Sequence, residues 1–169
     1  MGKTDERWDI YDKDKKLTGR TMLRNDWNMQ PGDFHLTVLA IIQNREGKYL
    51  VTKRAMTKSW APGHWEVSGG GVQAGEESLT GILREVREET GLDVSGFDGG
   101  YVFTYSRENP DEGDNYFVDV YKFVGDFGPD DVTLQEDETG EFMFVTLEEI
   151  QEIAEQGKFL HYKSIEQAF

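Results

Sequence analysis

The sequence predicts an α/β fold in which a mixed β-sheet packs between helices. Several short segments rich in β-branched and aromatic residues, such as HLTVLAII at residues 35–42, have the composition of strands. Short turn signals between some of these segments predict hairpins. Few segments have helical periodicity. Strands joined partly by hairpins and interrupted by few helices are typical of a mixed sheet covered by helices.

The size and composition of the chain indicate one folded unit. Its 169 residues are enough for one domain with a sizeable core, and 37% of them are hydrophobic, including 10 Phe, 7 Tyr and 4 Trp. The sequence contains no apolar run near 18 residues, and its N-terminus is charged where a signal peptide would be apolar. We therefore expect a cytoplasmic protein without a membrane span.

The charge and the cysteine count exclude several classes of function. The formal net charge of −15 disfavours nucleic acids and membrane surfaces as partners, because both are polyanionic. Zero cysteines exclude disulfides, thiolate metal sites and cysteine nucleophiles. An anionic substrate would have to be attracted locally, through metal ions and a few Lys and Arg side chains.

The first part of the chain predicts a hairpin extension. Residues 1–30 are polar, and segments 8–11 and 17–23 read as two short strands joined by a turn at 12–15. Pro31 and Gly32 close this extension. We expect residues 1–30 to pack on a core domain formed by residues 31–169.

The core domain is predicted to begin with strands. Residues 35–42 and 48–54 flank a turn at 44–47 and are expected to pair as a hairpin. A short strand at 64–67 then leads into a predicted glycine turn at 69–71.

A helix is predicted to follow from Glu77 or Ser78. Its apolar residues recur at spacings of three and four, and Gly91 suits the position just after its end. The residues predicted to face the core are Leu79, Ile82, Leu83 and Val86. The glutamates of the last turns are expected to point about 120° away from that stripe and to stay open to a ligand, taking about 100° per residue.

The remaining segments alternate between strands and loops before two final helices. We expect strands at 101–105, 116–123 and 141–145, with loops at 108–114 and 125–135 between them. Helices are expected at about 147–155 and 164–168. No internal repeat or low-complexity segment is present.

Three glutamates in the predicted first helix indicate a cation site. Glu85, Glu88 and Glu89 stand at i, i+3 and i+4, so their carboxylates share one face within a single turn. Carboxylate oxygens are the ligands that hard divalent cations prefer. A bare Glu-x-x-Glu-Glu on a helix is usually a solvated acidic face, so its sequence context decides the interpretation.

That context resembles the complete motif of the Nudix hydrolases. The motif is Gly, five residues, Glu, seven residues, then Arg-Glu-aliphatic-x-Glu-Glu-x-Gly-aliphatic. Every position of it is matched, by Gly70, Glu76, Arg84, Glu85, Val86, Glu88, Glu89, Gly91 and Leu92. The resemblance implies the α/β/α Nudix sandwich, here with an N-terminal β-hairpin extension. It also implies hydrolysis of a diphosphate linkage joined to a nucleoside or similar group, with Mg²⁺ or Mn²⁺ as cofactor.

The resemblance implies roles for individual residues. Glu85 and Glu89 match the main metal ligands and Glu88 a further ligand, while Arg84 would orient the glutamates and Glu76 would hold the loop to the helix.

Two further assignments concern the extra metal ligand and the general base. The carbonyl of Gly69 is an expected extra metal ligand, since a glycine turn lets the backbone approach an ion closely. The general base stays open between Glu85 and an acid of the 136–138 loop, among which Glu138 is favoured; the expected catalytic set is Glu85, Glu88, Arg84 and Glu138.

Basic and aromatic residues upstream of the motif are candidates for substrate binding. Lys53, Arg54 and Lys58 would border the pocket and bind phosphate, with ordinary surface charge as the alternative. Trp60, Tyr101 and Phe103 are candidates for stacking on a base, although core packing is the commoner use of such rings. His35 and His64 are expected to be packed or hydrogen-bonded residues.

The N-terminal half also resembles the Nudix branch that contains type I isopentenyl-diphosphate isomerase. That isomerase needs a cysteine, which this chain lacks, so we expect a hydrolase. A nucleoside diphosphate or a diphosphate-linked sugar is the expected small-molecule substrate. A non-catalytic nucleotide-sensing Nudix domain is the remaining alternative, and a homodimer is expected because the family often dimerises.

Overall fold

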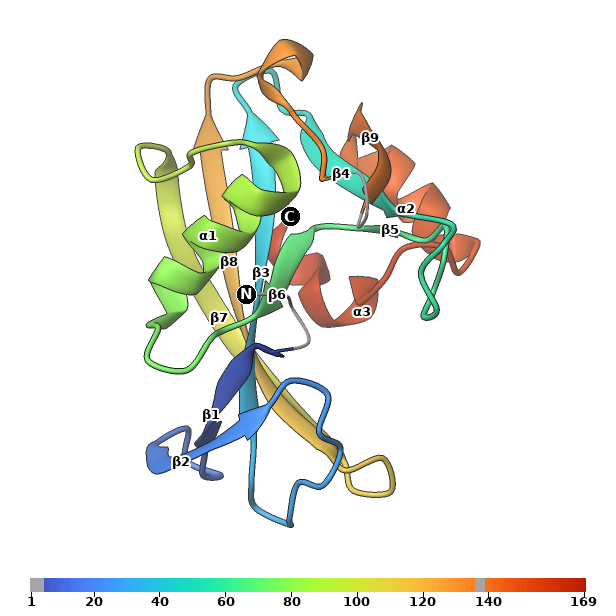
Figure 1. Ribbon diagram of the computed structural model, residues 1–169. Coiled ribbons are helices and arrows are strands. Elements are labelled where there is room, and N and C mark those ends of the chain that lie inside the picture. Colours follow the sequence, from blue (N-terminus) through green and yellow to red (C-terminus); the bar gives the residue numbers. More distant parts are fainter. Residues whose placement is uncertain (1–4, 136–138) are drawn as a thin grey trace.

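The computed structural model describes residues 5–135 and 139–169. Figure 1 shows a central sheet with helices on both sides and a separate hairpin at one end. The strands in chain order are β1 (Arg7–Tyr11), β2 (Leu17–Leu23), β3 (His35–Asn44), β4 (Tyr49–Arg54), β5 (Trp65–Glu66), β6 (Ser68–Gly71), β7 (Asp98–Asn109), β8 (Asp114–Gly125) and β9 (Thr139–Val145). The helices are α1 (Ser78–Thr90), α2 (Leu147–Glu155) and α3 (Tyr162–Ile165), with 3₁₀ turns at Pro129–Asp131 and Glu166–Ala168.

The main sheet is built around β3. Its strand order is β5-β4-β3-β8-β7, and β9 pairs with β4. Strand β3 pairs in parallel with β8 from His35 to Asn44, while its other edge pairs antiparallel with β6 and then with β4. The predicted mixed sheet is therefore confirmed, and so is the β3–β4 hairpin.

The two faces of β3 contribute to two separate cores. Val38, Ala40 and Ile42 are fully buried beneath α1, in a cluster that also contains Ile82 and Val86 of that helix. Residues 39 and 41 point the other way, into a cluster with residues of α2 and α3. This alternation follows from the two-residue period of a strand. It places α1 on one face of the sheet and α2 and α3 on the other, as Figure 1 shows, so the predicted α/β/α sandwich is confirmed.

The predicted glycine turn is wrong, because Gly69 to Gly71 belong to strand β6. Gly70 pairs with Val38 and Gly71 with Thr37 of β3. Glycines are required here by close approach: a methyl group added at Gly70 would lie 2.6 Å from the carboxylate of Glu85, and one at Gly71 would lie 2.6 Å from the indole nitrogen of Trp8. The strand is thus sandwiched between α1 and the N-terminal hairpin.

Helix α1 begins and ends where the sequence predicts. Gly91 follows it in the left-handed conformation, at φ 76°, and its N–H donates to the Arg87 carbonyl oxygen at 2.9 Å. Leu79 is 49% exposed, so its predicted core position is wrong. It lies in the first turn of the helix, and Ile82 and Val86 provide the buried contact.

Glu85 is more buried than the predicted open face implies. It is 1% exposed, and its carboxylate lies against β6. At about 100° per residue, Glu85 is only about 60° around the helix from Ile82, so it lies at the margin of the buried stripe.

The other elements differ from prediction mainly in length. Strands β7 and β8 are joined by a tight turn at 110–113, so the predicted 108–114 loop was too long. Helix α2 matches the predicted 147–155 helix, and the expected 164–168 helix is α3 followed by a 3₁₀ turn. Among the described helices, none has the length and apolarity needed to span a membrane.

The N-terminal hairpin forms its own small sheet of β1 and β2. It is attached to the core by backbone hydrogen bonds between Tyr11 and Phe34, at 2.7 and 2.9 Å. At its tip, Lys15 donates to both carboxylate oxygens of Asp119 on β8, at 2.7 and 2.9 Å. Asp119 is 2% exposed and also accepts hydrogen bonds from Ser78 and Thr104, so one carboxylate joins the hairpin to α1, β7 and β8.

We expect Lys15→Met to destabilise the protein, because it leaves the buried carboxylate of Asp119 without its cation. Removing one partner of a fully buried pair costs about 3–5 kcal/mol, and a loss of about 1–2 kcal/mol is expected here because the Lys15 side chain is 34% exposed. Urea unfolding measures the change, with Lys16→Met at the exposed neighbouring position as control. Equal stability of the two variants would contradict this role for Lys15.

Candidate active site

The site forms where helix α1 crosses strand β6. The carboxylate of Glu85 lies against Gly70, in the space that a side chain would otherwise fill. One turn later, Glu89 accepts a hydrogen bond from the backbone N–H of Gly69 at 3.2 Å. The glycine strand therefore holds two of the motif's carboxylates next to its own backbone.

Arg84 connects the acidic residues around this crossing. Its Nε and Nη2 donate to the two oxygens of Glu76 at 2.8 and 2.9 Å, a bidentate pair. Nη2 also donates to the Gly71 carbonyl oxygen at 3.1 Å, and Nη1 donates to Glu85 at 3.0 Å and Glu88 at 3.2 Å. One guanidinium thereby fixes the loop before α1, the end of β6 and two glutamates of the helix.

The same contacts shift the pKa values of Arg84 and Glu76. Hydrogen bonds to Glu76 raise the pKa of Arg84. Desolvation opposes this shift, but the nearby charge of Glu85 raises the pKa further, so the net shift is upward. Burial by itself would raise the pKa of Glu76, but the hydrogen bonds from Arg84 and from the Gln73 N–H outweigh it and lower the pKa. Both groups are therefore held in their charged forms.

The carboxylates open into a recess of about 190 Å³. Glu85, Glu89 and Glu66 contribute acidic side chains to it, and Arg54 and Lys58 contribute basic ones. Arg54 lies 3.6 Å from Glu66 by its Nη1 and donates through Nε to the Trp60 carbonyl oxygen at 2.9 Å. The recess therefore brings together opposite charges, an arrangement suited to a cation and an anion bound side by side.

A larger cleft of about 800 Å³ continues from the recess. The two share Arg24, Arg54, Lys58, Gly70 and His161 among their lining residues. The cleft adds aromatic side chains from separate parts of the chain, namely Trp8, Trp27, Trp60, Tyr105 and Tyr116. A ligand can thus reach both the carboxylates and an aromatic surface.

The structure brings some of the predicted site residues together and places others elsewhere. Arg84, Glu85 and Glu89 meet at the crossing with Gly69, and Arg54 and Lys58 line the recess. Glu88 lies on the exposed side of Arg84, and its side chain is 38% exposed. Lys53 pairs instead with Glu141 at 3.1 Å, and Glu138 lies outside the described residues.

The donor set matches a hard divalent cation in its chemistry. Carboxylate oxygens of Glu85 and Glu89 lie beside backbone that a side chain at Gly70 would block. Within residues 5–135 and 139–169, no group of three or more His, Cys, Asp or Glu side chains is placed to hold a metal ion by itself. Arg84 donates hydrogen bonds to Glu85 and Glu88.

Sequence reasoning missed several residues around the site. Glu66, Arg24 and Trp27 have no distinctive spacing relative to the motif, and His161 is about 70 residues beyond it. The His161 ring stacks near Trp60, with centroids 6.1 Å apart. Partial desolvation by the surrounding side chains lowers the pKa of His161, and the charges of Arg107 and Arg54 lower it further. The residue itself is exposed. Only the folded chain places these residues together.

The other aromatic and histidine predictions have clear outcomes. His35 is buried, stacks on Trp8 with centroids 4.1 Å apart and lies 2.9 Å from Asp114 by its Nε2, so the expected packed histidine is confirmed. Trp60 lines the cleft, whereas Phe103 packs against the α2 and α3 side of the sheet. Tyr101 is 59% exposed on β7 and hydrogen-bonds Thr104.

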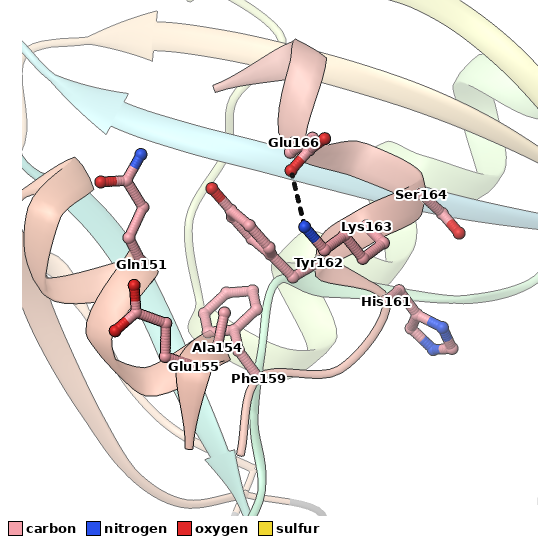
Figure 2. A pocket seen from close by; sticks show the side chains of 9 residues that line it. All are labelled: Gln151, Ala154, Glu155, Phe159, His161, Tyr162, Lys163, Ser164 and Glu166. Carbon is pink, nitrogen blue, oxygen red and sulfur yellow. Dashed lines mark ion pairs between the residues drawn. The ribbon is translucent and has the colours of Figure 1, made fainter. Parts of the chain in front are cut away.

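A separate cavity of about 530 Å³ lies between α2 and α3. Figure 2 shows Phe159 and Tyr162 among the side chains that line it, together with an ion pair between Lys163 and Glu166, which are 3.9 Å apart. His161 lines both this cavity and the cleft. Glu85 and Glu89 of the motif line the recess instead, so the chemistry is expected there.

Comparisons with known proteins show the family. A family model described as the NUDIX domain matches residues 33–167. An uncharacterized Nudix hydrolase of Listeria monocytogenes is 33% identical over 167 residues, which cover 97% of this chain and 94% of the relative. The nucleoside triphosphatase NudI of Escherichia coli K12 is 46% identical over 54 residues, 32% of this chain and 38% of that protein.

A solved structure supports the fold. The crystal structure of DR0079 from Deinococcus radiodurans has a TM-score of 0.70 and 23% sequence identity, and covers 89% of this chain and 90% of that one. At this identity the likeness concerns the architecture alone.

We expect Glu76→Gln to lower stability at neutral pH and to have less effect in acid. The folded pKa of Glu76 lies below its ordinary value of 4.5, so its contribution is fully present above that value and is lost as the pH falls through the folded pKa. A loss of roughly 1–3 kcal/mol is expected at pH 7, as for hydrogen bonds to charged groups. Urea unfolding at several pH values measures it, with Glu77→Gln as the exposed control. A deficit that persists undiminished below the folded pKa would refute the assignment.

Proposed function

Because the chain belongs to the Nudix hydrolase family, we propose that it hydrolyses a phosphoanhydride bond of a nucleoside diphosphate-type substrate, with Mg²⁺ or Mn²⁺ as cofactor. The observation that carries this proposal is the crossing of α1 and β6, where Glu85 lies against Gly70 and Glu89 against the Gly69 N–H. Hard oxygen donors in a recess that also contains Arg and Lys suit a cation and a diphosphate together.

We assign the cation to Glu85 and Glu89, with the Gly69 carbonyl and Glu88 as further ligands. A divalent cation bound by these residues would supply charge neutralisation for the diphosphate and activation of a water molecule. Arg84 orients Glu85 through its 3.0 Å hydrogen bond, and Glu76 holds Arg84 in turn. This arrangement fixes the carboxylates before substrate arrives, so little reorganisation is needed during the reaction.

Arg54 and Lys58 are proposed to bind phosphate oxygens. Both line the recess and the cleft, so they lie between the carboxylates and the aromatic surface. Arg54 is held in place by the Trp60 carbonyl and by the Trp60 ring, whose centroid is 5.1 Å from the guanidinium carbon. The proton acceptor is either Glu85 or Glu138. Because Lys53 pairs with Glu141, we leave it out of the phosphate-binding set.

The test compares cleavage of a panel of compounds in the presence of Mg²⁺ or Mn²⁺. The panel contains nucleoside di- and triphosphates, a nucleoside diphosphate sugar, ADP-ribose and isopentenyl diphosphate. Phosphate or pyrophosphate release identifies the bond that is broken, and isomerisation of isopentenyl diphosphate would support the isomerase alternative.

We expect Glu89→Gln to lower kcat at least roughly 100-fold on any cleaved compound, because loss of even an outer-shell group costs about 10–100-fold at metal sites. Glu152→Gln, an exposed change on α2, is the matched control and should leave kcat unchanged. A Glu89 variant with parental kcat would show that the metal assignment is wrong. Binding of nucleotide without cleavage of any compound would favour the sensing alternative.

A further inference from the structure

One wall of the cleft is formed by residues that precede the segment matched by the NUDIX family model. Trp8, Arg24 and Trp27 line the cleft, yet they all precede residue 33, where the family model begins. They belong to the N-terminal hairpin and to the segment that follows it. Figure 1 shows this hairpin beside the ends of β3, β7 and β8. The substrate cleft is thus completed by an extension whose sequence the general family pattern does not specify.

This wall is firmly attached to the core. Asn115 on β8 donates to the Asp33 carbonyl oxygen at 3.1 Å, and Lys15 pairs with the buried Asp119. The backbone at Trp27 lies so close to the β7–β8 turn that a methyl group at Gly113 would be 2.8 Å from the Trp27 carbonyl carbon. The wall therefore has a defined position relative to the carboxylates, as specific recognition requires.

Trp27 and Trp60 present indole surface to the cleft. They are 47% and 56% exposed, although large aromatic side chains are usually more buried. Trp60 already has Arg54 and the His161 ring against it. Trp27 contacts Trp8 in a tilted arrangement, with centroids 6.5 Å apart and planes at 58°. An exposed aromatic ring in a cleft gains favourable burial when a flat ligand covers it.

The cleft combines charged and aromatic side chains. It shares Arg54 and Lys58 with the recess that contains Glu85, which suits a diphosphate. The rest of its lining includes indoles and the polar side chains of Asn25 and Ser59. Aromatic surface with a few polar groups fits a nucleobase better than an unbranched or isoprenoid chain, which offers no partner to those polar groups. A volume of about 800 Å³ is within the usual range for small-molecule sites.

From these observations we propose that the N-terminal extension determines substrate specificity, with Trp27 stacking on the base of a nucleotide whose diphosphate lies in the recess. The proposal rests on the proposed function for the position of the diphosphate. Trp27 is a specificity-determining residue in this account and takes no part in bond breaking. Its contribution is to binding, so its loss should raise KM and Kd for nucleotides and leave kcat nearly unchanged.

The test measures binding by calorimetry without a divalent cation, so that no hydrolysis is needed. ADP, GDP, CDP and UDP are titrated into the full chain, with inorganic pyrophosphate as the ligand that lacks a base. Parent, Trp27→Ala and Trp27→Phe are compared. Leu17→Ala is the matched control, because Leu17 is 64% exposed on the same hairpin. Thermal unfolding confirms that each variant is folded.

We expect Trp27→Ala to weaken binding of the preferred nucleoside diphosphate about tenfold, as stacking of a base on an aromatic side chain typically contributes. Pyrophosphate binding should stay within about twofold of the parent, and Trp27→Phe should restore most of the nucleotide affinity because it retains an aromatic face. Leu17→Ala should match the parent.

Two results would overturn the proposal: unchanged nucleotide binding by Trp27→Ala, or equal weakening of nucleotide and pyrophosphate. Weak nucleotide binding by the parent, no tighter than pyrophosphate, would also overturn it. These outcomes are separate from failure of the proposed hydrolysis, which is judged by cleavage with metal and by Glu89→Gln. A parent that binds nucleotides through Trp27 and cleaves none would retain this inference and refute the hydrolase proposal.

Discussion

The close approach of helix α1 to strand β6 is the constraint on which the rest of the structure depends. It requires glycine at position 70, because a side chain there would displace the Glu85 carboxylate. It is stabilised from one side by Ile82 and Val86, which are fully buried, and from the other by Arg84, which joins Glu76 to the Gly71 carbonyl. Burial of each such aliphatic side chain contributes about 1.5–3 kcal/mol. Stability and the geometry of the carboxylates therefore have the same origin.

The distribution of charge fits this arrangement. The chain has a formal net charge of −15, which by itself would repel an anionic ligand. Arg24, Arg54 and Lys58 nevertheless line the cleft and the recess, and each recess carboxylate is close to a cationic or backbone donor or to the site proposed for a cation. Local compensation of this kind lets an acidic protein bind a diphosphate without binding polyanions over its whole surface.

The sequence predicted the architecture and the motif residues well, but it did not predict most of the residues that line the cleft. Local patterns located α1, α2 and the β3–β4 hairpin, because spacing and turn chemistry act over a few residues. They missed that Gly69 to Gly71 form a strand, since close packing against α1 and Trp8 is a tertiary property. For the same reason they underestimated the burial of Glu85 and did not identify Trp27 or His161, whose approach to the cleft depends on contacts between distant segments.

The most direct test of the central claim is an anomalous diffraction map from crystals soaked in Mn²⁺. The account predicts a peak within about 2.0–2.6 Å of carboxylate oxygens of both Glu85 and Glu89, beside the backbone of Gly69, in the parent protein. The same peak should be lost in Glu89→Gln crystals. A map without a peak beside ordered Glu85 and Glu89 side chains, or with the ion held elsewhere in the cleft, would contradict it.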